Sequence, residues 1–173
     1  IARAVGIRGS RRPDILDLTA GLGVDSFVLA CLGCQVDLVE RHPLVRLILQ
    51  DGLLRATQFT ETVHIVSRMQ LHPGNAMQIL SQWQGKPPDV VYLDPMFSGS
   101  GKTGRQAAVK KGMSLLRQLV GIDADAGELL EPALKLARYR VVIKRSRTAP
   151  YLGNRQPIYQ LLGKTNRFDI HVI

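Results

Sequence analysis

The chain has 173 residues, of which 45% are hydrophobic and 21% charged, and this composition excludes disordered and fibrous proteins. No apolar run approaches the roughly 20 residues that a membrane-spanning helix needs, and the first residues lack the apolar stretch of a signal peptide. We therefore expect a soluble, cytoplasmic protein that forms one domain over residues 1–173 and binds no membrane.

The formal charge of +9 is unevenly distributed along the chain. Residues 1–101 hold nine basic and nine acidic residues, whereas residues 102–173 hold 14 basic and five acidic ones. Clustered Lys and Arg side chains attract a polyanion such as nucleic acid, because they displace counterions from its phosphates. A solvated basic surface is the alternative, and charge alone does not decide between the two.

Apolar runs and helical spacing alternate along the chain. Short apolar runs predict strands at 15–20, 35–40, 63–66, 89–94 and 140–144, and apolar spacing predicts helices over about 25–32, 43–54, 75–83, 107–120 and 128–138. A terminal antiparallel pair is expected at 158–162 and 168–173. This order predicts an α/β fold with a doubly wound, mostly parallel Rossmann-like sheet and an antiparallel C-terminal edge.

The two cysteines, Cys31 and Cys34, have the spacing of half a zinc site. Such a site normally needs a second pair of ligands, and the sequence has no other cysteine. We therefore predict no metal and interpret both residues as buried, reduced thiols.

A glycine turn follows the first predicted strand, in the segment from Asp17 to Asp25 that contains Gly21 and Gly23. Glycines at this place allow close approach of a nucleotide, and Glu40 at the end of the second strand can accept hydrogen bonds from ribose hydroxyls. The third glycine of a dinucleotide fingerprint is replaced by Ser26. An acid such as Asp25 also suits a sulfonium cofactor better than a pyrophosphate, so the turn favours S-adenosylmethionine (SAM) over NAD.

The fourth strand ends in the tetrapeptide Asp94-Pro95-Met96-Phe97. A carboxylate and a carbonyl placed together can accept both N–H bonds of an exocyclic amine and so direct its lone pair at a methyl group. Phe97 can stack on a base that has been turned out of its helix. The tetrapeptide therefore predicts methyl transfer to an amine, with catalytic roles for Asp94, Pro95 and Phe97.

Several segments together resemble the ribosomal RNA small subunit methyltransferase J family. They are DLTAGLGVDSFVLA (17–30), LVER (38–41), VYLDPMF (91–97), VKK (109–111) and RFDI (167–170). The resemblance implies SAM-dependent methylation of guanine N2 in 16S ribosomal RNA, as free RNA or within the 30S particle. Members also carry an N-terminal extension, and only 14 residues precede Ile15 here.

Carried over by position, the resemblance and the glycine turn give a set of expected cofactor contacts: Asp17, Gly21, Gly23, Val24, Asp25, Glu40, Arg41, Gly74, Asn75 and Asp94. Basic residues of the second half are expected to contact RNA phosphates, namely Lys102, Arg105, Lys110, Lys111, Lys144 and Arg145. Three alternatives remain open: methylation of an adenine, cytosine or protein glutamine amine; an RNA-binding module without catalysis; and a nicotinamide oxidoreductase.

Overall fold

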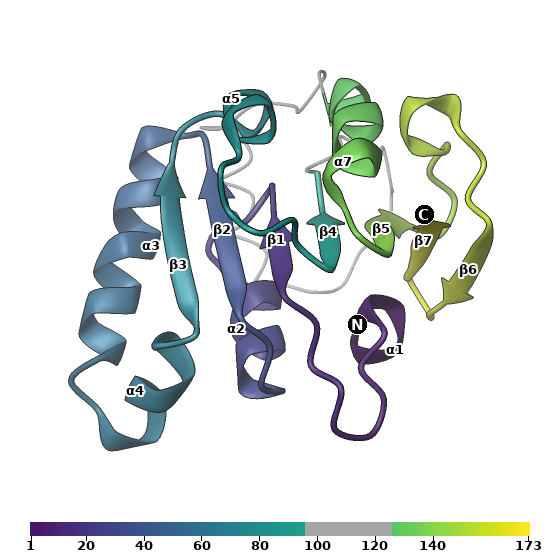
Figure 1. Cartoon of the computed structure of the whole chain (residues 1–173). Helices are drawn as coiled ribbons and strands as arrows, with labels where there is room; N and C mark the ends of the chain where they lie inside the picture. Colours follow the sequence, from purple (N-terminus) through teal and green to yellow (C-terminus); the bar gives the residue numbers. More distant parts are fainter. Residues whose placement is uncertain (96–125) are drawn as a thin grey trace, which may run out of the picture.

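The computed structural model describes residues 1–95 and 126–173 and contains a seven-stranded sheet in the order β3-β2-β1-β4-β5-β7-β6 (Figure 1). The strands are β1 (Ile15–Asp17), β2 (Val36–Glu40), β3 (Met69–Pro73), β4 (Val90–Leu93), β5 (Arg140–Ser146), β6 (Tyr159–Leu162) and β7 (Asn166–Val172). The first five strands run parallel, and β7 pairs antiparallel with both β5 and β6. The predicted fold class, with its antiparallel edge, is confirmed.

Helices cover both faces of this sheet. One face packs against α5 (Ala76–Gln82) and α7 (Leu130–Leu136), which follows the 3-10 helix η1 (Ala126–Leu129). The other face packs against α1 (Ala2–Val5), α2 (Val24–Cys31) and α3 (Pro43–Ala56), with α4 (Thr60–Val66) beside α2 and α3. A second 3-10 helix, η2 (Leu152–Asn154), lies against η1. Strand β4 is buried on both faces, as expected for a central strand.

The third strand was predicted at the wrong place. Residues 63–66 form the end of helix α4, and the strand that pairs with β2 is β3, where Met69 and Leu71 pack into the core while Gln70 and His72 point to the opposite face. A run of four apolar residues fits a strand or a buried helix equally well, so its periodicity could not distinguish them. Pairing with β2 and packing against α2 decided the outcome.

The cysteine interpretation was half right. Cys34 is buried in the core beside β2, whereas Cys31 is exposed at the last position of α2. Leu29 and Ala30 take the buried positions of that turn, so Cys31 points away from the sheet. Among the described residues, none of the helices has the length and apolar character that crossing a bilayer requires.

Candidate active site

The glycine turn follows β1, and the strand order of the sheet reverses between β1 and β4 (Figure 1). Ligands of open α/β sheets bind at this point, outside the carboxyl ends of the strands. Gly21 and Gly23 have φ of 55° and 74°, a left-handed backbone that glycine adopts without strain. A Cβ on Gly23 would lie 2.7 Å from Cδ1 of Leu49, whereas one on Gly21 would meet no described atom within 4 Å. The left-handed backbone thus favours glycine at both positions, and at Gly23 a side chain would also require the terminal methyl of Leu49 to shift.

The Asp17 side chain holds this turn by hydrogen bonds from the protein interior. Its carboxylate accepts hydrogen bonds from the Ser26 hydroxyl at 2.5 Å and from the Thr19 N–H at 3.1 Å, and the side chain is buried. Burial raises the pKa of Asp17 to about 7, although both hydrogen bonds oppose the shift. Because Asp17 lies in the interior, we assign it to holding the turn and not, as predicted, to direct cofactor contact.

Glu40, also buried, ties the second strand to the same turn. One carboxylate oxygen accepts the Gly21 N–H at 2.9 Å, and the other accepts the His42 N–H at 2.7 Å. The β2–β3 register pairs Glu40 with Pro73, so the predicted residues Gly74 and Asn75 follow at the same edge of the sheet. The carboxylate is thereby fixed at the end of β2, where a ribose would bind.

A charged cluster lies where β4 ends, beside the neighbouring strand β5. The Lys144 ammonium contacts Oδ2 of Asp25 at 2.7 Å and Oδ2 of Asp94 at 2.9 Å. The Tyr92 hydroxyl also donates to Asp25, at 2.5 Å, and the Asp94 N–H donates to the Thr19 hydroxyl oxygen at 2.6 Å. The structure thus brings together the predicted residues Asp25 and Asp94, and Pro95 follows directly as a buried residue.

These residues fit a nucleoside cofactor with a positive charge. The buried Glu40 carboxylate accepts the backbone N–H of His42, and Nδ1 of the His42 ring is buried without a hydrogen-bond partner among the described residues. Such a nitrogen suits a hydroxyl-bearing ligand. The carboxylates of Asp25 and Asp94 are acidic groups that could complement the positive charge of a sulfonium.

Two of the predicted RNA contacts have other surroundings. Arg145 is buried, and its guanidinium donates to the Pro150 carbonyl at 2.7 Å, which argues against a phosphate contact at the surface. Lys144 belongs to the carboxylate cluster. Contact of Lys144 with RNA stays a prediction. The remaining predicted contacts and the predicted stacking residue lie outside the described residues: Lys102, Arg105, Lys110, Lys111 and Phe97.

The sequence reasoning missed the supporting roles of Thr19, Ser26, Tyr92 and Lys144. Thr19 lies in the glycine-turn segment, two residues after Asp17, and Ser26 directly follows Asp25. Lys144 ends the predicted fifth strand, and in a parallel sheet it comes beside the residue that ends the fourth. This relationship could have predicted the contact of Lys144 with Asp94, but only if β4 and β5 were already known to be neighbours.

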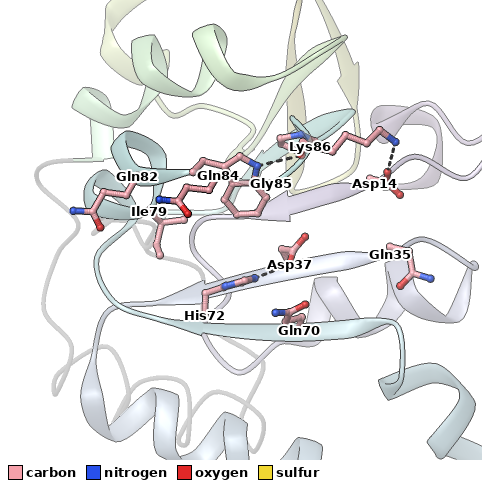
Figure 2. Close-up of a pocket in the computed structure, with 12 residues that line it drawn as sticks. Asp14, Gln35, Asp37, Gln70, His72, Ile79, Gln82, Gln84, Gly85 and Lys86 are labelled. Carbon is pink, nitrogen blue, oxygen red and sulfur yellow. Dashed lines mark hydrogen bonds and ion pairs between the residues drawn. The ribbon is translucent and has the colours of Figure 1, made fainter.

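A cavity of about 590 Å³ lies elsewhere, between the β2–β3 face and the segment that connects α5 with β4 (Figure 2). In Figure 2, Asp37 and His72 lie below Gln84 and Lys86, and Nε2 of His72 is hydrogen-bonded to Oδ1 of Asp37 at 2.6 Å. Glutamine side chains and Trp83 complete much of the wall. None of the residues predicted to bind cofactor or RNA lines this cavity, so it is separate from the candidate active site.

The sheet order, the glycine turn and the acids that end β2 and follow β4 are those of a Rossmann-like enzyme that binds a nucleoside cofactor. A family model described as "Putative SAM-dependent methyltransferase" matches residues 1–173. The chain is 53% identical over 171 residues to ribosomal RNA small subunit methyltransferase J of Dechloromonas aromatica (strain RCB), covering 99% of the chain and 69% of that protein. It therefore belongs to the ribosomal RNA small subunit methyltransferase J family of SAM-dependent methyltransferases.

Two further relatives agree with this assignment. The enzyme of the same name from Pseudomonas fluorescens (strain Pf0-1) is 52% identical, with 99% of this chain and 65% of that protein covered. The crystal structure of a SAM-dependent methyltransferase from Neisseria gonorrhoeae superposes with a TM-score of 0.79 at 41% identity, covering 99% of this chain and 65% of that one. The chain thus spans about two thirds of the length of these relatives.

Proposed function

We propose that the chain is the catalytic part of an enzyme that methylates the exocyclic N2 of a guanine in small-subunit (16S) ribosomal RNA. Its relatives bear the name of a small-subunit ribosomal RNA methyltransferase. The observation that carries the proposal is the position of Asp94. Asp94 directly follows the central strand β4. Its N–H donates to the Thr19 hydroxyl oxygen, and its carboxylate lies 2.9 Å from the Lys144 ammonium. When bound, SAM supplies an electrophilic methyl group.

The residues of the chain orient the amine that attacks this methyl group. A guanine N2 is a weak nucleophile because its lone pair is delocalised into the ring. The Asp94 carboxylate and the Pro95 carbonyl accept its two N–H bonds and favour a pyramidal nitrogen. Phe97 stacks on the base, and Glu40 accepts hydrogen bonds from the cofactor's ribose. The S–C bond of SAM would break as the N–C bond forms, leaving S-adenosylhomocysteine, and the nitrogen would lose its extra proton to solvent.

The RNA partner is supported by charge. The whole excess of positive charge lies beyond residue 101, where 14 basic residues face five acidic ones. We propose that Lys102, Arg105, Lys110 and Lys111 contact phosphates, of free RNA or of the 30S particle. Binding by such contacts should weaken steeply with salt.

The test uses an Asp94→Ala variant, with the exposed Asp51→Ala as a matched control. Undermodified 30S subunits, free 16S RNA and DNA are offered with labelled SAM, and the labelled nucleoside is identified by mass spectrometry. We expect Asp94→Ala to lose methylation by a factor of roughly 100 or more while it still binds cofactor. Unchanged methylation would remove Asp94 from catalysis, label on adenine alone would refute the guanine assignment, and thermal stabilisation by NAD but not SAM would indicate an oxidoreductase.

A further inference from the structure

The Lys144 ammonium bridges the two carboxylates of the charged cluster, those of Asp25 and Asp94. Lys144 lies within β5, one position beyond the Leu93–Ile143 pair of the parallel register, and so directly beside Asp94. Its ammonium reaches across to Asp25 on α2, with 2.7 Å and 2.9 Å to the two carboxylates. One side chain therefore joins three elements, β4, β5 and α2, at the proposed reaction centre.

The surroundings of this ammonium strengthen the two ion pairs. The Lys144 side chain is 25% exposed, Asp25 is 23% exposed and Asp94 is 39% exposed, so the pairs are only partly screened by water. Burial lowers the pKa of Lys144, but the Asp94 and Asp25 carboxylates raise it further, and the balance places it above the ordinary lysine value. Lys144 is therefore a permanent cation at neutral pH and cannot act as a general base.

We propose that Lys144 is a positioning residue of the methyl transfer: it clamps the carboxylates of Asp25 and Asp94 together and keeps Asp94 as the ionised acceptor of the target amine. This inference rests on the proposed function for its catalytic consequence. A protonated Asp94 would lose half of its capacity to accept N–H bonds. An Asp94 side chain that rotates freely would no longer hold its carboxylate oriented toward the target amine. By holding Oδ2, Lys144 prevents both.

Other charged groups lie around Asp94, and the experiment must leave them in place. Within the described residues they include Asp17 on β1, Asp25 on α2, Tyr92 on β4 and Arg145 on β5, and the α-amino group of Ile1 interacts with Asp25 and Lys144. A Lys144→Gln variant removes the ammonium and changes none of them. Lys144→Arg retains the charge, and Lys86→Gln removes a cation from an exposed pair with Asp14 as the matched control.

The first measurement uses the cofactor-free protein with ¹³C-labelled aspartate, in which the Asp94 carboxyl is titrated by NMR. We expect Lys144→Gln to raise its midpoint by about one pH unit or more, because an opposite charge within 4 Å favours the ionised form. Lys144→Arg and Lys86→Gln should leave the midpoint within a few tenths of a unit. An unchanged midpoint in Lys144→Gln would overturn the proposal, and this result does not depend on any methylation assay.

The second measurement is the pH profile of methylation. The acidic limb of kcat/KM should move upward in Lys144→Gln by the same amount as the Asp94 midpoint, and Lys144→Arg should restore it. If the variant instead weakens RNA binding and lowers its salt dependence by about one counterion while the limb stays in place, Lys144 is a phosphate contact and the proposal fails.

Loss of folding in Lys144→Gln would still leave a test on the native protein. The ¹³Cε signal of Lys144 should then titrate at higher pH than that of an ordinary exposed lysine, and titration at the ordinary value would refute the clamp. If the native protein methylates no guanine, the function proposed above fails. The NMR titration still tests by itself whether Lys144 holds the carboxylates of Asp25 and Asp94.

Discussion

The N–H of Asp94 donates a 2.6 Å hydrogen bond to the hydroxyl oxygen of Thr19, and this bond joins the ends of the two central strands at the point where their order reverses. Thr19 also donates its own N–H to Asp17, so the residue after β4 is tied to the buried acid that ends β1. The Thr19 hydroxyl oxygen thus adds to the pairing of β1 with β4 in positioning Asp94 relative to the glycine turn.

A Thr19→Val substitution tests this link, because valine keeps the shape and removes the acceptor. We expect the free energy of unfolding to fall by about 1–3 kcal/mol, the cost of leaving a partly buried N–H without its partner. Cofactor affinity, measured by calorimetry, should fall with it. Thr19→Ser retains the oxygen and should lose much less, and equal losses in the two variants would show that the methyl group matters instead.

A Glu40→Gln substitution tests the ribose position. Glutamine keeps one acceptor oxygen but places an NH₂ group against either the Gly21 or the His42 N–H, where both carboxylate oxygens now accept. Since hydrogen bonds to charged groups contribute about 1.5–3 kcal/mol, we expect SAM affinity to fall by roughly 10- to 100-fold. The exposed Glu61→Gln serves as control. Full affinity in Glu40→Gln would show that this residue does not hold the cofactor.

The buried acid Asp17 predicts a specific dependence of stability on pH. Its pKa is raised by burial from the model-peptide value of 3.8 to about 7, so between these values the folded protein binds a proton that the unfolded chain releases. Its contribution is therefore complete below about pH 4 and is lost as the pH rises to about 7, by about 4 kcal/mol at most. Denaturant titrations should show this decline, and the difference from Asp17→Asn isolates it. A difference that stays constant with pH would contradict the shift.

The two cysteines should differ sharply in reactivity. Cys31 is exposed, whereas Cys34 lies in the core, where burial raises the pKa of its thiol to about 11. Because the thiolate is the reacting species, we expect a maleimide at pH 7.5 to modify Cys31 within minutes and to spare Cys34 in the native protein. Peptide mapping by mass spectrometry reads both sites. Equal labelling would indicate that the segment between α2 and β2 opens locally.

The sequence predicted the parts of the fold that local pattern determines. The strand at 89–94 and the helices near Pro43 and Asn75 were confirmed, since Pro43 starts α3 and the Asn75 side chain caps α5 with a 2.8 Å bond to the Met77 N–H. The strand expected at 63–66 was wrong, because only tertiary pairing distinguishes a short apolar strand from a helix turn.

The same division applies to the candidate site. Glycines, Glu40 and Asp94 could be found from the sequence because each follows a strand that local pattern reveals. The pairing of Lys144 with Asp25 spans 119 residues and three elements, so no local pattern encodes it. The burial of Arg145 follows from the strand β7 that packs antiparallel beside β5. Such long-range relationships require the assembled sheet.

The last prediction concerns a buried ion pair on the antiparallel edge. Arg167 donates from Nε and Nη2 to the two oxygens of Asp169, at 2.8 Å and 3.1 Å, and Gln160 donates to the same carboxylate at 2.5 Å. Both charged side chains are buried, and Arg167 also donates to the carbonyls of Ser146 and Arg147 at the end of β5. The pair therefore fastens β7 to the strand that carries Lys144.

We expect Asp169→Asn to lower the free energy of unfolding by about 3–5 kcal/mol, because it leaves the Arg167 guanidinium buried without its counter-charge. Asp51→Asn, which breaks the exposed pair with Arg55, should change it by less than about 1 kcal/mol. Urea denaturation measures both. If Asp169→Asn costs no more than the exposed control, water must reach the Arg167 guanidinium in solution, and the edge is held by its backbone ladder and apolar packing alone.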